Sequence, residues 1–196
     1  MPLLALTSAL ALAPRLPESR TAFACTLCAL GFGCIGDILL LSVSEKRFMA
    51  GALSFFAGHI FWIVQYVVSP NGTSAYASGG RMFFPLALIC FICYGIVLAS
   101  TYVLLGKPKG VMGGGVIAYG GILCALNFTA INAVVKGING KAALFYLAGS
   151  ILFFISDGIL SYTVFKKDIP HSRFIIMITY IAAQALLAAG CVLPYI

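Results

Sequence analysis

The stretch that decides the fold is KAALFYLAGSILFFISDGILSYTV, residues 141–164. It is predominantly apolar, and Asp157 is the one charged side chain inside it after Lys141. A helix of about 20 apolar residues can cross the hydrocarbon core of a bilayer. The whole 196-residue chain has a similar character, with 62% hydrophobic and 9% charged residues and a mean hydropathy of +1.07. A soluble domain is excluded, because its core could not bury so many apolar side chains.

Five further apolar runs of spanning length are separated by short loops or by breaks rich in Pro and Gly. They cover residues 21–43, 48–68, 82–105, 111–135 and 174–196. The opening run, Met1–Ala13, would rise only about 20 Å as a helix, which is too short for a core of about 30 Å. We therefore expect an all-α, polytopic transmembrane helical bundle of seven apolar segments, the first one incomplete. Residues 1–196 would form one integral membrane domain in which consecutive helices are antiparallel neighbours.

The distribution of charged residues distinguishes the two membrane faces of this bundle. Twelve Lys and Arg residues against five Asp and Glu residues give a net charge of +7, but the basic residues lie in short loops and form no patch interleaved with aromatics. No nucleic acid partner is therefore expected. The loops of one face carry Lys46, Arg47, Lys107, Lys109, Lys166, Lys167 and Arg173, and those of the other carry Arg15, Arg20, Arg81, Lys136 and Lys141. The small excess of Lys and Arg on the first face favours a cytoplasmic location for that face. The membrane would be a bacterial plasma membrane or a eukaryotic endomembrane.

Two carboxylates, Asp37 and Asp157, fall within apolar runs, whereas Glu18, Glu45 and Asp168 are expected in loops. An ionised side chain at the bilayer centre costs about 2.5 to 3.5 kcal/mol on insertion scales, so such residues usually face the bundle interior and serve a function. The helices 21–43 and 141–164 run parallel because an even number of crossings separates them. Each Asp lies six or seven residues before the end of its helix, about 10 Å from the same face. The two carboxylates should share one depth.

The sequences around the two Asp residues are similar. Each is followed by a basic loop and then by a helix in which, at an offset of 125 positions, Phe55 and His59 match Tyr180 and Gln184. A spacing of four residues puts each pair on one helical face. A diverged helix-hairpin repeat would explain this match, and chance similarity between apolar segments is the alternative. If the repeat is real, Asp37, His59, Asp157 and Gln184 converge on one cavity.

Four fragments in register resemble the YhhN-like lysoplasmalogenases, a family of multi-pass membrane proteins. The fragments are Gly36-Asp37, Gly51 with Phe55-Phe56 and Gly58-His59, Leu152–Asp157 with Leu160, and Tyr180–Gln184. The resemblance covers residues from about 31 to 184 and implies an eight-helix bundle, of which this chain shows seven apolar segments. It also implies hydrolysis of the vinyl ether bond of lysoplasmalogens, which yields a fatty aldehyde and glycerophosphoethanolamine or glycerophosphocholine. The partners would be a lysophospholipid substrate and the lipid bilayer, with the oligomeric state left open.

Vinyl ether hydrolysis begins with protonation of the alkene carbon, which gives an oxocarbenium ion that water then attacks. Asp37 and Asp157 are the candidate catalytic residues, because two carboxylates at low dielectric can hold one proton between them. One would donate the proton and the ionised partner would stabilise the cation and guide water, although the sequence does not say which is which. His59, Tyr119, Tyr180 and Gln184 are candidate supporting residues at a similar depth. The candidates for binding the substrate phosphate are Lys46, Arg47, Lys167 and Arg173.

No cofactor and no metal are expected. Cys25-x-x-Cys28 and Cys90-x-x-Cys93 lie within apolar helices and lack the turns of a zinc knuckle, and His59 and His171 are the only histidines. Gly113-Gly114-Gly115 lacks the strand and the Lys-Ser/Thr of a phosphate loop, so close helix packing explains it better.

The sequence bears on three other functions. An intramembrane aspartyl protease would need Gly-x-Gly-Asp, but Cys34 stands at the position of the first glycine. A retinal protein would need a Lys in the last helix, and residues 174–196 contain none. A proton-coupled carrier of a small or lipid solute remains the alternative, because membrane carboxylates also serve as proton relays. A carrier would show flux driven by a pH gradient and form no product.

Overall fold

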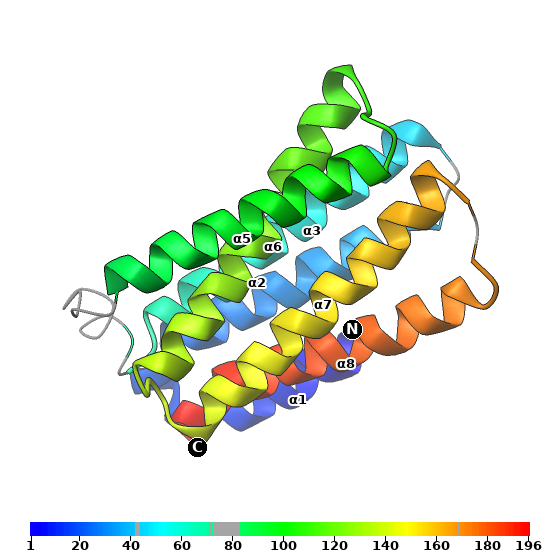
Figure 1. Ribbon diagram of the computed structural model, residues 1–196. Helices are drawn as coiled ribbons and strands as arrows, with labels where there is room; N and C mark the ends of the chain where they lie inside the picture. The colour runs from blue at the N-terminus through cyan, green and yellow to red at the C-terminus, as the bar shows by residue number, and fades with distance from the viewer. Residues whose placement is uncertain (42–43, 71, 73–82, 168) are drawn as a thin grey trace.

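The computed structural model describes residues 1–41, 44–70, 72, 83–167 and 169–196. In these ranges the regular structure consists of α-helices and two short 3₁₀ turns (Figure 1). In chain order they are α1 (Pro2–Leu12), η1 (Ala13–Arg15), α2 (Leu16–Leu40), α3 (Glu45–Val67), α5 (Phe83–Leu104), α6 (Gly110–Val135), α7 (Lys141–Phe165), α8 (Ser172–Val192) and η2 (Leu193–Tyr195).

The predicted spans are confirmed. Six helices within the described ranges, α2, α3, α5, α6, α7 and α8, are long and apolar enough to cross a membrane, and α1 is the short seventh segment. Many large apolar side chains point outward, such as that of Phe91, which is 78% exposed. Such side chains are stable against lipid tails and not against water. The chain is therefore a multi-pass integral membrane protein.

Two predicted loops belong instead to helices. Glu45 begins α3, so that residues 45–47 form its first turn, and residues 16–20, including Glu18, form the start of α2. Charged residues at a membrane surface are compatible with the first turn of a helix, so the charges in the sequence did not mark these positions as loops. Residues 42–43 and 82 of the predicted spans lie outside the described ranges, as do Arg81 and Asp168.

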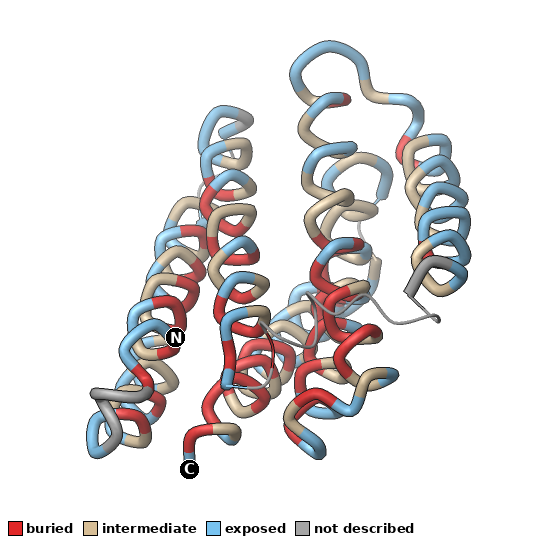
Figure 2. Tube along the Cα trace, turned by 90° about the vertical axis from the view of Figure 1, so that its left-hand side faces the viewer, coloured by how far each residue is buried: buried red, intermediate tan, exposed pale blue. Residues whose placement is uncertain are grey.

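The helices form two closely packed pairs, and α6 connects the pairs. α2 packs along α3 and α7 packs along α8, while α6 contacts both α3 and α7 and thereby links the pairs. α1 lies against α2 and α8, and α5 packs on the outside of α6 (Figure 1). Most of the surface of α5 is exposed. In Figure 2 this helix is the pale blue and tan one at the right, which follows the longest grey segment. The candidate site lies on the inner side of this peripheral helix.

Glycines allow the closest approach, between α7 and α8. A Cβ atom on Gly149 would lie 2.8 Å from the backbone nitrogen of Leu187, and one on Gly190 would lie 2.7 Å from that of Tyr146. Helix backbones approach this closely in membranes when small residues line the contact. The tight pairing fixes how α7 is placed against α8, and with it the positions of Asp157 and Tyr180.

Candidate active site

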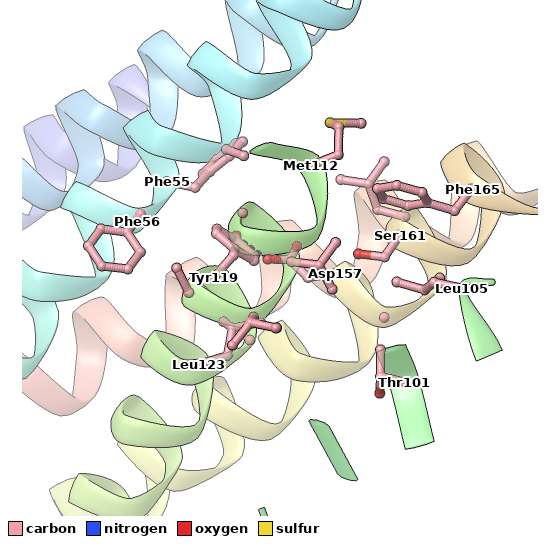
Figure 3. A pocket seen from close by; sticks show the side chains of 18 of the residues that line it. Phe55, Phe56, Thr101, Leu105, Met112, Tyr119, Leu123, Asp157, Ser161 and Phe165 are labelled. Atoms are coloured by element: carbon pink, nitrogen blue, oxygen red, sulfur yellow. Dashed lines mark hydrogen bonds between the residues drawn. The ribbon is translucent and has the colours of Figure 1, made fainter. Parts of the chain in front are cut away.

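Asp157 carries a buried carboxylate. Its side chain, on α7, is only 7% exposed. The Tyr119 hydroxyl on α6 donates a short hydrogen bond to Asp157 Oδ2, and the two side chains meet between these helices in Figure 3. This bond pairs one carboxylate oxygen with a strong donor, as a buried polar group requires. The position of Tyr119 along its helix predicted that it lies near the carboxylates, and the structure places it against Asp157.

A cavity of about 260 Å³ opens beside this pair. Its walls come from α3, α5, α6 and α7, with Leu40 added from α2. Tyr119 and Asp157 lie on its wall together with two other hydroxyl-bearing residues, Thr101 and Ser161, and the remaining lining is apolar (Figure 3). Four lining residues, Phe48, Leu105, Met112 and Phe165, lie within about one turn of the helix ends at the basic face. The cavity thus extends from the buried carboxylate towards that face.

An aromatic cluster forms the inner boundary of the site. The Tyr180 ring lies edge to face against Phe55 at 5.7 Å and against Phe153 at 5.5 Å between centroids. The His59 ring contacts Phe153 at 4.3 Å and Tyr119 at 5.9 Å in the same way. Phe55 lines the cavity, whereas the Tyr180 and His59 rings of the cluster do not. Among the described residues, the cavity wall accordingly includes none from α8 and only Leu40 from α2.

Asp37 lies on the other side of this cluster. It is half-buried on α2, next to Gly36, where a Cβ atom would come within 2.7 Å of the Phe55 ring. Asp37 is not among the residues that line the cavity. The buried Tyr180 hydroxyl is within electrostatic reach of both Asp37 and Asp157, and Asp37 and Gln184 are close enough to interact with it by hydrogen bonding. Tyr180 is thus the group that connects the two carboxylates.

His59 presents a free acceptor to the interior. Its side chain is 2% exposed, and Nδ1 lies 2.6 Å from the Phe55 carbonyl oxygen, an atom that can only accept. The proton of the neutral ring therefore belongs on Nδ1, which leaves the lone pair on Nε2. Nε2 is buried and has no hydrogen-bond partner in the described part of the chain. Such a nitrogen can accept a proton from a ligand or a water molecule.

Gln184 supports the same region from α8. It is 2% exposed, and its Oε1 accepts a hydrogen bond of 3.2 Å from Trp62 Nε1 on α3. A Cβ atom on Gly33 would lie 3.2 Å from the Tyr180 hydroxyl and 3.5 Å from Gln184 Nε2, so both residues face α2 close to Asp37. The structure places Asp157 and Tyr119 on the cavity wall and His59 and Tyr180 within the aromatic cluster, whereas Asp37 and Gln184 do not line the cavity.

The predicted phosphate-binding residues lie at the surface. Lys46, Arg47, Lys167 and Arg173 are all exposed, at the end of the bundle where the cavity approaches the loops. Lys166 also belongs to this face, since its Nζ lies over Gly106 at 2.9 Å from an added Cβ atom. The contribution of α5 to the cavity and the position of Ser161 on its wall were not predicted, because neither helix has a polar face that would show its orientation in the sequence.

Comparison with known proteins shows to which protein family the chain is related. A model of the YhhN family matches residues 1–191. The chain belongs to the YhhN family. Among curated relatives of this family member, lysoplasmalogenase TMEM86B of Homo sapiens is 29% identical over 159 residues, which cover 81% of this chain and 59% of the relative. Lysoplasmalogenase TMEM86A of Bos taurus is 28% identical over 163 residues, which cover 82% of this chain and 62% of the relative.

The family member described here thus spans about three fifths of the length of these relatives. No solved structure matches it.

Proposed function

We propose that this protein hydrolyses the vinyl ether bond of lysoplasmalogens to a fatty aldehyde and a glycerophospholipid headgroup. The observation that carries the proposal is a buried carboxyl group, Asp157, that lies on an apolar cavity and is hydrogen-bonded by Tyr119. An apolar cavity suits a hydrocarbon chain, and a carboxylic acid held in it suits proton transfer to carbon. The name lysoplasmalogenase of the relatives gives the substrate class.

Asp157 is assigned the proton donor, because it lies on the cavity wall and Asp37 does not. Its proton passes to the β-carbon of the vinyl ether, and the positive charge is shared by the α-carbon and the ether oxygen. The Tyr119 hydrogen bond stabilises the carboxylate that this step leaves behind. Water adds to the α-carbon and loses a proton, and the hemiacetal breaks its bond to the glycerol oxygen. The balance is one vinyl ether and one water to one aldehyde and one alcohol.

His59 and Asp37 complete the proton movements. His59 does not line the cavity, but its ring contacts Tyr119 on the wall and its Nε2 is buried and unpartnered among the described residues. This nitrogen can accept a proton from the attacking water if that water reaches it past Tyr119. Asp37 acts on the site through Tyr180, whose hydroxyl interacts with both carboxylates. Its negative charge favours the cation on the other side of the cluster. Asp37 is in this account a positioning residue, and Asp157 is the catalytic residue.

The direct test is to incubate the purified protein in detergent with a lysoplasmalogen and to measure free aldehyde. Aldehyde formed in proportion to protein and time supports hydrolysis. The carrier alternative predicts no aldehyde in this assay. It predicts instead solute flux driven by a pH gradient in reconstituted vesicles.

Removal of one basic charge at this end of the bundle should weaken substrate binding. Arg47→Gln, Lys167→Gln and Arg173→Gln should each raise KM about fivefold with a smaller change in kcat, because an exposed ion pair to the phosphate contributes about 1 kcal/mol. Lys136→Gln and Lys141→Gln on the opposite face are the matched controls and should leave KM unchanged. An unchanged KM in all three loop variants would place the phosphate elsewhere.

Activity should survive removal of metal ions. The proposed proton donor is a carboxylic acid, and no three His, Cys, Asp or Glu side chains in the described part of the chain are grouped so that they could hold a metal ion. Full turnover is expected after exhaustive dialysis against a chelator. A loss of activity that zinc alone restores would replace this mechanism with a metal-assisted one.

A further inference from the structure

Ser161 is a polar residue on the cavity wall that the mechanism above does not use. It lies on α7 four residues after Asp157, on the same face of the helix and about 6 Å nearer to the basic face. Both residues line the cavity, and in Figure 3 the Ser161 hydroxyl points towards Asp157. Ser161 therefore stands between the proton donor and the end of the cavity at which the phosphate would be bound.

The Ser161 hydroxyl differs from the other serine and threonine hydroxyls of α7. Ser150 donates to the Leu147 carbonyl at 2.8 Å, Ser156 to that of Ile176 at 3.2 Å, and Thr163 to that of Leu160 at 2.8 Å. Hydroxyls in membrane helices commonly pair with backbone carbonyls in this manner, because lipid offers no partner. No hydrogen bond from Ser161 to another residue is found within the described ranges. Its hydroxyl is available to a molecule in the cavity.

We propose that Ser161 binds the free sn-2 hydroxyl of the substrate and so favours lysoplasmalogens over lipids without that hydroxyl. This inference rests on the proposed function. In a lysoplasmalogen, five covalent bonds separate the β-carbon that receives the proton from the sn-2 oxygen, a span of at most about 6 Å. The separation of Asp157 and Ser161 along α7 is about the same. A lipid with its β-carbon at Asp157 therefore brings its sn-2 oxygen to Ser161.

The size of the cavity agrees with a single-chain substrate. At about 260 Å³ it lies just below the range of about 300 to 1,000 Å³ seen for ligand pockets. Leu160 and Phe165, which flank Ser161 on the wall, are apolar. Ser161 is therefore the hydrogen-bonding side chain that α7 offers to the cavity between Asp157 and the basic face. An sn-2 hydroxyl placed there without Ser161 would lose its hydrogen bonds to water without gaining one from α7 at this position.

The experiment compares two substrates in two proteins. The substrates are a lysoplasmalogen and its 2-deoxy analogue, which lacks only the sn-2 hydroxyl, and the proteins are the wild type and Ser161→Ala. The wild type should prefer the hydroxylated substrate about three- to tenfold in kcat/KM, the usual value of one neutral hydrogen bond. Ser161→Ala should reduce this ratio to about one, and Ser161→Thr, which keeps a hydroxyl, should restore it.

The matched control is Thr163→Val, which removes a hydroxyl of α7 that is bonded to Leu160 and does not line the cavity. It should keep the wild-type ratio. If the wild type forms aldehyde but shows no preference, or if Ser161→Ala keeps the preference, the role of Ser161 is wrong and the proposed function stands. If the wild type forms aldehyde from neither substrate, the proposed function itself is wrong.

Discussion

Asp157→Asn is expected to lower kcat at least about 100-fold while the bundle stays folded. Asparagine has nearly the same shape as aspartate, and its amide oxygen can still accept the hydrogen bond from Tyr119. It carries no proton that can be given to carbon, and general acid catalysis usually contributes a factor of about 100 to 10,000. The unfolding temperature should therefore change by no more than about 3 °C, in contrast with the loss of turnover.

Asp37→Asn should cause a loss of similar kind, although this residue lies outside the cavity. Its carboxylate is coupled to the site through Tyr180, so the two Asp residues should act as one unit. The double variant should then be scarcely slower than either single variant. A purely structural Asp would behave differently, because any loss of turnover would follow a lower unfolding temperature. Near wild-type kcat in folded Asp37→Asn would remove that residue from the mechanism, and the same result in Asp157→Asn would overturn the mechanism.

Filling the cavity from Gly158 should reduce activity and raise stability together. Gly158 lines the cavity next to Asp157, and a Cβ atom there would meet nothing within 4 Å. A leucine at this position would occupy a large part of the space assigned to the hydrocarbon chain. Gly158→Leu should therefore lower kcat/KM at least about tenfold. Replacement of a helical glycine should also stabilise the protein by about 0.5 to 1 kcal/mol.

Gly121→Leu on α6 is the matched control for this prediction. Gly121 also has open space around it, but it does not line the cavity. It should show the gain in unfolding temperature with unchanged turnover. Equal activity of Gly158→Leu and the wild type would mean that the substrate does not occupy this cavity.

The sequence was sufficient for the helices and for the depth of the site. A spanning helix is recorded directly in the length of an apolar run, so the six spans could be predicted to within a few residues at most of their ends. Depth follows from counting residues along a helix, and for that reason Tyr119 could be placed near Asp157. The first turn of α3 was missed because the charges of Lys46 and Arg47 indicate a membrane surface equally well in a loop and in a helix.

Helix rotation could not be predicted in the same way. α2, α6 and α7 are apolar on nearly every side, since their outer faces meet lipid and their inner faces meet neighbouring helices. No periodic pattern therefore shows that Asp157 and Ser161 face the cavity while Asp37 faces Tyr180. That arrangement depends on tertiary contacts such as those of Gly36 with Phe55 and of Gly149 with α8. The division of the two carboxylates by an aromatic cluster is a property of the packed bundle alone.

The most direct test of the central claim is the position of hydrogen transfer during turnover. Purified wild-type protein is incubated in D₂O with a lysoplasmalogen, and the aldehyde is trapped at once and analysed by mass spectrometry. Protonation of the vinyl ether carbon predicts one deuterium at the carbon next to the carbonyl group, formed at a rate that Asp157→Asn lowers at least about 100-fold. Absence of aldehyde, aldehyde without this deuterium, or an equal rate in the variant would contradict the account.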